Sequence, residues 1–94
     1  MDLELKGKTV FITGSTAGIG FSTAKALLSE GASVILNGRT SATVESAIKR
    51  LEQEFPEEAI SGIAADFSIL NEVNNLLENL PKIDILINNV GVYS

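Results

Sequence analysis

Three glycines stand directly behind an apolar run near the start of the chain. The run Val10-Phe11-Ile12 leads into Thr13-Gly14-Ser15-Thr16-Ala17-Gly18-Ile19-Gly20, in which the glycines are spaced Gly-xxx-Gly-x-Gly. Glycine permits a tight backbone turn and leaves no Cβ in the way of a phosphate. A helical pattern begins at once, and a helix N-terminus directs free N–H groups and the positive end of its dipole toward an anion. The spacing therefore indicates a nucleotide site.

The surroundings of this glycine loop strengthen the interpretation. A buried strand is expected before the loop and a helix after it, which is the arrangement that a dinucleotide site requires. A Walker-type loop is excluded, because Phe21 and Ser22 follow Gly20 where that loop would need a lysine. The alternative interpretation is a tight turn between strand and helix that binds no ligand.

A second candidate group follows the next predicted strand, whose end reads Asn37-Gly38-Arg39. In dinucleotide folds this strand end meets the adenosine ribose, where an acidic residue would bind the 2′-hydroxyl and repel a 2′-phosphate. No acid stands here. A guanidinium beside a 2′-phosphate forms charge-assisted hydrogen bonds, worth about 1.5–3 kcal/mol, which favours NADP over NAD. The alternative is that Arg39 is an ordinary surface arginine.

Two further groups stand at predicted strand ends. Asp66 and Phe67 follow the third strand, where the carboxylate could accept from an adenine amino group and the ring could line the base. Asp66 could equally open the turn that follows. Asn88-Asn89-Val90-Gly91 follows the fourth strand. Because buried amides are costly unless they are hydrogen-bonded, we expect them to bridge neighbouring strands, with Gly91 leaving room for a ribose. The alternative is a simple turn that ends the strand.

The elements that must position these residues alternate between strands and helices. Strands are expected at 9–13, 33–37, 60–65 and 83–88, and helices at 18–30, 41–55 and 69–80. Helical spacing of apolar residues predicts the buried faces, which are Ile19, Ala24, Leu27 and Leu28 in the first helix, Val44, Ala47, Ile48, Leu51 and Phe55 in the second, and Val73, Leu76, Leu77 and Leu80 in the third.

This order predicts an α/β fold, a doubly wound parallel sheet of the Rossmann type with four strands and three helices. Strands that alternate with helices form βαβ units, which place helices on both faces of the sheet. Right-handed crossovers give the strand order 3-2-1-4, and ligands bind where the order reverses. The sheet is expected to be incomplete at the edge of the fourth strand, and an open apolar edge favours self-association. The alternative is a homo-oligomer of the full-length protein.

Composition narrows the class of protein. The 94 residues allow one small domain, and 45% apolar with 20% charged residues is typical of a globular chain. A net charge of −5 argues against a nucleic-acid partner. Without cysteine or histidine there is no disulfide, no thiolate metal site and no histidine base, so no metal is expected. The apolar stretches are too short to span a membrane and no signal peptide is recognised, so we expect a cytoplasmic protein.

Together the motifs resemble the short-chain dehydrogenases/reductases, and the resemblance covers essentially all of the chain. The segment 13–20 fits that family's Thr-Gly-xxx-Gly-Ile-Gly signature, and the segment 88–91 fits Asn-Asn-Ala-Gly with Val90 in place of alanine. Asp66 and Arg39 fit the family's strand-three aspartate and the basic residue of its NADP-preferring members. The resemblance implies NADP as the cofactor, with NAD less favoured. The residues expected to bind it are Gly14, Ser15, Thr16, Gly18, Ile19, Gly20, Asn37, Arg39, Asp66, Phe67, Asn89, Val90 and Gly91.

The family's catalytic residues are a serine, a tyrosine and a lysine that lie beyond the strand-four motif. Only Val92, Tyr93 and Ser94 follow Gly91, so no catalytic residue is expected in this chain. The resemblance implies an NADP(H)-dependent oxidoreductase that transfers hydride between nicotinamide and a carbonyl or alcohol. Residues 1–94 would be the N-terminal portion of its cofactor-binding domain, inactive alone without the C-terminal catalytic half. The alternative is a stand-alone, non-catalytic nucleotide-binding or interaction module.

Overall fold

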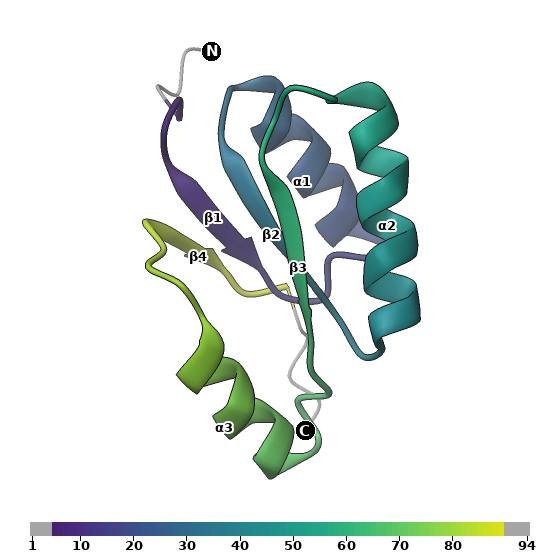
Figure 1. The fold of residues 1–94 in the computed structure, drawn as a ribbon, viewed down its shortest axis with the longest axis vertical. Coiled ribbons are helices and arrows are strands. Elements are labelled where there is room, and N and C mark those ends of the chain that lie inside the picture. Colours follow the sequence, from purple (N-terminus) through teal and green to yellow (C-terminus); the bar gives the residue numbers. More distant parts are fainter. Residues whose placement is uncertain (1–4, 90–94) are drawn as a thin grey trace.

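A computed structural model describes residues 5–89 as a four-stranded parallel sheet with three helices. Along the chain the elements are β1 (Thr9–Ile12), α1 (Gly18–Ser29), β2 (Ser33–Gly38), α2 (Ser41–Glu54), β3 (Ile60–Ala64), α3 (Leu70–Asn79) and β4 (Ile85–Ile87) (Figure 1). The strand order is β3-β2-β1-β4, and every neighbouring pair is parallel. The predicted fold class and strand order are confirmed.

The two central strands supply the core. Val10 and Ile12 of β1 pair with Val34 and Leu36 of β2, and each of the four side chains is at most 1% exposed. Strands in a parallel sheet are covered on both faces, so they contain continuous apolar runs instead of alternating polar residues. This is why these segments form strands whose sequences lack the alternation of a half-exposed sheet.

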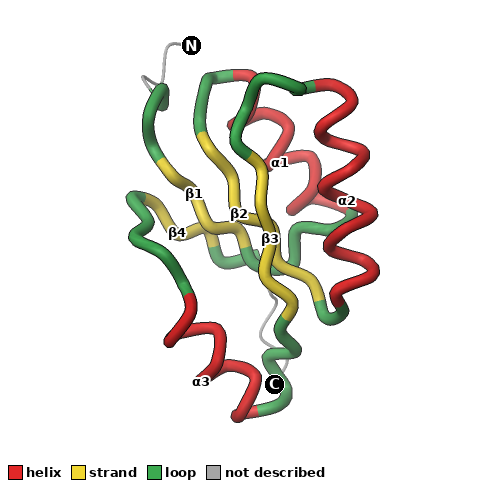
Figure 2. The backbone as a smooth tube through the Cα atoms, in the orientation of Figure 1, coloured by secondary structure: helices red, strands yellow, loops and turns green. Residues whose placement is uncertain are grey.

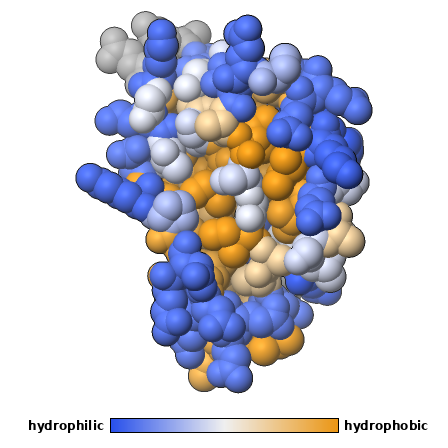
Figure 3. All heavy atoms as spheres, viewed as in Figure 1, coloured by the Kyte–Doolittle hydropathy of each residue, from blue (hydrophilic) through white to orange (hydrophobic). Residues whose placement is uncertain are grey.

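The helices cover the two faces of the sheet unequally. As Figure 2 shows, α1 and α2 lie together on one face, whereas α3 lies toward one end of the other face. The larger core, between the sheet and the helix pair, includes Ala24 and Leu28 of α1 and Leu51 of α2. The smaller core on the α3 face contains Phe11, Ile35, Ala65 and Leu76. Figure 3 shows apolar side chains open to solvent over the middle of this second face.

Two residues that were expected in the core are exposed. Ile19 is 77% exposed and Leu77 is 64% exposed. In α1 the buried residues are Gly20, Phe21, Ala24 and Leu28, because the contact of Gly20 with the preceding loop fixes the rotation of the helix and turns Ile19 outward. In α3 only Leu76 is buried, since this helix covers only part of its face of the sheet.

The boundaries of the elements differ from the predictions by one or two residues. Thr40 caps α2, with its Oγ1 accepting a hydrogen bond from Thr43 N at 3.2 Å. The last strand is shorter than 83–88 and covers only Ile85–Ile87. Asp84, just before it, instead bonds to Thr9 through both its backbone N–H and its carboxylate.

Candidate functional site

The candidate residues within the described range gather where the strands end, around the loop between β1 and α1. The carboxyl ends of parallel strands lie at one edge of a sheet, and β1 has β2 on one side and β4 on the other. The loop after β1 therefore opens at the point where the strand order reverses, which is where ligands bind in such folds. Each predicted group of polar residues follows one of the four strands.

The glycine loop has the backbone conformation that a phosphate cradle needs. Gly14 has φ +58° and Gly18 has φ +60°, a region that residues with a Cβ rarely adopt. A Cβ added to Gly18 would meet nothing within 4 Å, so the start of α1 faces open space. The N-cap residue, Ala17, provides no side-chain hydrogen bond to the helix. The first N–H groups of α1 are therefore without a side-chain cap beside space that an anion could enter.

Gly20 has a different task from Gly18. A Cβ on Gly20 would lie 2.4 Å from Gly14 O and 2.7 Å from Asn89 Nδ2. The first turn of α1 thus packs directly on the loop and on the end of β4, and no side chain fits between them.

Ser15 and Asn37 fix the glycine loop to the end of β2. Their exposed fractions are 0% and 1%. Ser15 Oγ donates to Ile12 O at 2.7 Å and accepts from Asn37 N at 2.8 Å. Asn37 Oδ1 accepts from Gly14 N at 3.0 Å, and its Nδ2 donates to Ile63 O at 3.1 Å. Both residues were predicted to belong to the cofactor site, and that role stays a prediction. The structure shows that their side chains are buried in hydrogen bonds that position the loop.

The end of β4 is tied to the same loop. Thr13 Oγ1 donates to Asn88 Oδ1 at 3.0 Å and accepts from Asn89 N at 2.8 Å. Asn89 Nδ2 donates to Gly14 O at 3.1 Å. The expected bridging of neighbouring strands by these amides is confirmed. Val90 and Gly91, which complete the predicted motif, lie outside the described residues, as do Tyr93 and Ser94.

Two charged residues stand at the ends of β2 and β3. Arg39 is exposed and makes no hydrogen bond or ion pair with the described part of the chain. Asp66 Oδ1 accepts from Ser68 Oγ at 2.7 Å and from Ser68 N at 2.9 Å. These bonds lower the pKa of Asp66, slight desolvation opposes them, and the charge of Arg39 lowers it a little further.

Asp66 therefore opens the turn after β3, which was one of its two predicted roles. Its contact with an adenine stays a prediction. Phe67, beside it, is 38% exposed, so its ring is accessible. The exposed side chain of Ile19, at the start of α1, is likewise accessible at the same end of the sheet.

Sequence reasoning missed two residues that shape this site. Thr13 was recognised only as part of the signature, yet it is 5% exposed and its hydroxyl joins β1 to the end of β4. The sequence does contain a signal for this role, because a buried hydroxyl that follows an apolar strand needs a hydrogen-bond partner. Gly38 is buried beneath the side chain of Thr16, a contact between distant segments that no local pattern shows.

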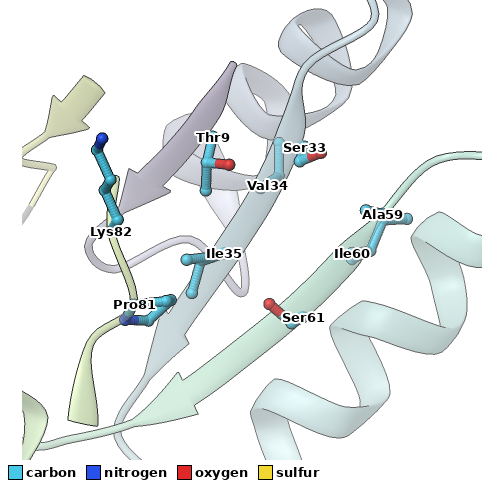
Figure 4. Close-up of a pocket in the computed structure, with 9 residues that line it drawn as sticks. All are labelled: Thr9, Ser33, Val34, Ile35, Ala59, Ile60, Ser61, Pro81 and Lys82. Atoms are coloured by element: carbon cyan, nitrogen blue, oxygen red, sulfur yellow. The ribbon is translucent and has the colours of Figure 1, made fainter. Parts of the chain in front are cut away.

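A separate cavity of about 380 Å³ lies toward the other end of the strands (Figure 4). Ser33 and Ala59, near the starts of β2 and β3, line it together with Pro81 and Lys82. Lys82 is the one titratable residue in its lining, so the cavity offers no acid–base pair and no cluster of metal ligands. It is a hollow on the sheet face that α3 covers only in part.

Within residues 5–89, no group of three or more acidic residues stands close enough to hold a metal ion. Among the same residues, no helix has both the length and the apolar character needed to cross a bilayer.

The sequence matches known proteins along nearly its whole length. A family model described as "short chain dehydrogenase" matches residues 8–94. The uncharacterized oxidoreductase YvaG of Bacillus subtilis is 41% identical over 93 residues, which cover 99% of this chain and 35% of that protein. The 5-keto-D-gluconate 5-reductase of Escherichia coli is 38% identical over 95 residues, which cover 95% of this chain and 36% of the reductase.

The solved structures agree with these relatives. L-sorbose reductase from Gluconobacter frateurii, in complex with NADPH and L-sorbose, superposes with a TM-score of 0.84 at 31% identity. The match covers 100% of this chain and 37% of that enzyme. The chain thus spans only about a third of the length of the proteins it matches, for example 35% of YvaG.

Proposed function

The chain belongs to the short-chain dehydrogenase family of oxidoreductases, and on that premise we propose that it binds NADP(H) for hydride transfer between nicotinamide and a carbonyl or alcohol. The observation that carries the proposal is the open cradle at Gly18, with uncapped N–H groups of α1 beside it. When bound, the cofactor supplies the hydride chemistry, and the protein supplies binding, orientation and electrostatics.

Different residues in the described range would bind different parts of the cofactor. The N–H groups at the start of α1 would hold the pyrophosphate, and Arg39 would bind the 2′-phosphate of the adenosine ribose. Asp66 and Phe67 would contact the adenine. The side chains of Ser15 and Asn37 hold the loop in place from inside the protein.

NADP is the preferred cofactor in this proposal for three reasons. The guanidinium of Arg39 makes no hydrogen bond or ion pair within residues 5–89, so it is available to a phosphate. Two of the similar solved structures, L-sorbose reductase and a short chain oxidoreductase of Pseudomonas aeruginosa, are described as holding NADPH. The same choice follows from the absence of an acidic residue at position 38.

We further propose that these 94 residues supply the cofactor-binding part of the activity and no catalytic acid. The serine, tyrosine and lysine that the resemblance implies for proton transfer would have no counterparts here, and hydride transfer to a carbonyl needs a group that protonates its oxygen. Incubating the chain with NADPH and a panel of carbonyl compounds should give no turnover. Turnover at ordinary enzyme rates would contradict this part of the proposal. The cytoplasmic location expected from the sequence stays a prediction.

Titration calorimetry with NADP, NAD and ATP tests the binding proposal. Arg39→Ala should weaken NADP binding by roughly ten- to a hundredfold, the loss expected for a charge-assisted hydrogen bond, and should leave NAD binding unchanged. Lys49→Ala, which removes an exposed positive charge on α2, is the matched control and should change neither affinity. Equal affinities for ATP and NADP would instead favour a stand-alone nucleotide-binding module.

A further inference from the structure

The side chain of Thr16 lies directly over Gly38, where β2 reaches the candidate site. A Cβ added to Gly38 would lie 2.6 Å from Thr16 Cγ2 and 3.2 Å from both Thr43 Oγ1 and Val44 Cγ2. The backbone is not the obstacle, because Gly38 is a strand residue paired with Ala64 and its φ is not positive. A side chain at position 38 would therefore need its neighbours to shift.

The three neighbours of Gly38 differ in their freedom to move. Thr43 Oγ1 is held by a hydrogen bond to Thr40 O at 3.0 Å, and Val44 is a core residue that is 4% exposed. The half-buried side chain of Thr16 makes no hydrogen bond with the described part of the chain. The methyl group of Thr16 is thus both the nearest obstacle and the one whose removal would open room.

The position is chemically important because it directly precedes Arg39. It stands at the strand end where an acidic side chain would bind a ribose 2′-hydroxyl and repel a 2′-phosphate. Asp66, whose pKa is lowered in part by the charge of Arg39, accepts hydrogen bonds from Ser68 at its Oδ1. A carboxylate at position 38 would therefore place a new negative charge beside Arg39.

We propose that Thr16 determines cofactor specificity by filling the space that a side chain at position 38 would need. The inference rests on the proposed function, since it concerns the same nucleotide site. It states that the choice between NADP and NAD depends on the pair Thr16 and Gly38 as well as on Arg39. A carboxylate added at position 38 should be tolerated, and should reach the ribose, only when the methyl group of Thr16 is removed.

The packing half of the inference is tested by thermal unfolding. Gly38→Ala alone should lower Tm by at least about 4 °C, because overpacking strains a close contact in a domain of this size. Adding Thr16→Ser, which removes only the methyl group, should restore most of that loss. Adding Thr16→Val instead removes the hydroxyl but keeps a methyl group over position 38, so it should restore none of it. A Gly38→Ala variant as stable as the wild type would overturn the inference.

The effect on cofactor specificity is tested by calorimetry with NADP and NAD on double variants at positions 16 and 38. Gly38→Asp with Thr16→Ser should shift the ratio of the two dissociation constants toward NAD by at least about tenfold, the effect of one charged hydrogen bond gained and a repulsion added. Gly38→Asp with Thr16→Val should remain less stable and should not gain affinity for NAD.

The outcomes separate this inference from the proposed function. Wild-type protein that binds NADP, together with an unchanged ratio in the double variant with serine, would overturn the inference alone. Wild-type protein that binds neither nucleotide would overturn the proposed function and the inference with it.

Discussion

At the scale of single residues, only one carboxylate oxygen of Asp66 accepts hydrogen bonds from the described residues. Its Oδ1 accepts both hydrogen bonds from Ser68, whereas its Oδ2 makes none with the described residues. The fixed oxygen orients the carboxylate, and the second oxygen is available to a donor such as an adenine amino group. A side chain can thus stabilise a turn and still bind a ligand, which reconciles the two interpretations of this aspartate.

Asp66 should also make the stability of the protein sensitive to acid. Hydrogen bonds from Ser68 lower its pKa from the ordinary value of 3.8. A pKa lowered in the folded state contributes stability that is complete above the unfolded pKa and is lost as the pH falls through the folded pKa. Wild-type Tm should therefore exceed that of Asp66→Asn at neutral pH, and the difference should shrink below about pH 4.

A series of thermal melts between neutral pH and about pH 3 measures this effect. Glu57→Gln serves as the control, because Glu57 is an exposed carboxylate in a turn with no described hydrogen bond. A wild-type advantage over Asp66→Asn that stayed constant across the whole range would show that the charge of Asp66 contributes nothing.

Gly18 and Gly7 share a backbone conformation, but only Gly18 lies in the proposed phosphate cradle. Both have positive φ, +60° and +83°, and a Cβ on either would meet nothing within 4 Å. Replacing either glycine by alanine should cost about 1 kcal/mol of folding free energy, from backbone strain alone. Only Gly18→Ala should also weaken NADP binding, because its methyl group enters the proposed cradle. Equal NADP affinities for the two variants, measured by calorimetry, would place the phosphates elsewhere.

At the scale of elements, partly buried hydrogen bonds join the ends of the strands into one support for the glycine loop. Asn37 reaches both Gly14 N and Ile63 O, so it connects the loop with β2 and β3. Thr13 and Asn89 connect the same loop with the end of β4. The loop is therefore held from both sides. All of these contacts are made within the protein, so they form without a bound ligand.

Removing the amide of Asn37 should damage both the fold and the site. Asn37→Leu keeps a similar volume but removes the partner of the partly buried Gly14 N and Ile63 O, and an unsatisfied polar group costs about 1–3 kcal/mol when it is fully buried. We expect a large fall in Tm and weaker NADP binding in the fraction that remains folded. Asn71→Leu, at an exposed position of α3, is the control and should change Tm little. Wild-type stability in Asn37→Leu would mean that the network is not stabilising.

The order of the elements could be predicted from the sequence because its signals are local. Apolar runs indicated the central strands, and helical spacing indicated α2 with its buried Val44, Ala47 and Leu51. The exposure of Ile19 could not be predicted this way, because the rotation of α1 depends on a contact between Gly20 and a loop outside the helix.

The site was predictable to a similar extent. The spacing of its glycines identified the loop and the strand ends around it. The burial of Ser15 and Asn37 was not foreseen, since their partners lie on other strands, and the contact of Thr16 with Gly38 joins two segments far apart in the sequence. Residue type and spacing thus indicated where a candidate site would lie, whereas the burial and hydrogen bonding of its side chains depend on the fold.

At the scale of the whole molecule, the two faces of the sheet are unequally protected. The face under α1 and α2 holds the larger core, while the face under α3 keeps apolar side chains accessible (Figure 3). Leu86, in β4, is 60% exposed, and β4 is an edge strand with β1 as its only partner within residues 5–89. An exposed apolar edge strand is a template for pairing with another copy of the chain.

We therefore expect the protein to self-associate as its concentration rises, and expect Leu86→Lys to reduce that association. A lysine on an edge strand opposes pairing, because a second copy would bring like charges together and bury an ammonium group. Leu70→Lys is the matched control, since Leu70 is 73% exposed but lies at the start of α3 and not on β4. Light scattering over a range of concentrations measures the mean mass of each variant. A wild-type chain that stays monomeric throughout, or an equal effect of both lysines, would show that the edge formed by β4 does not drive association.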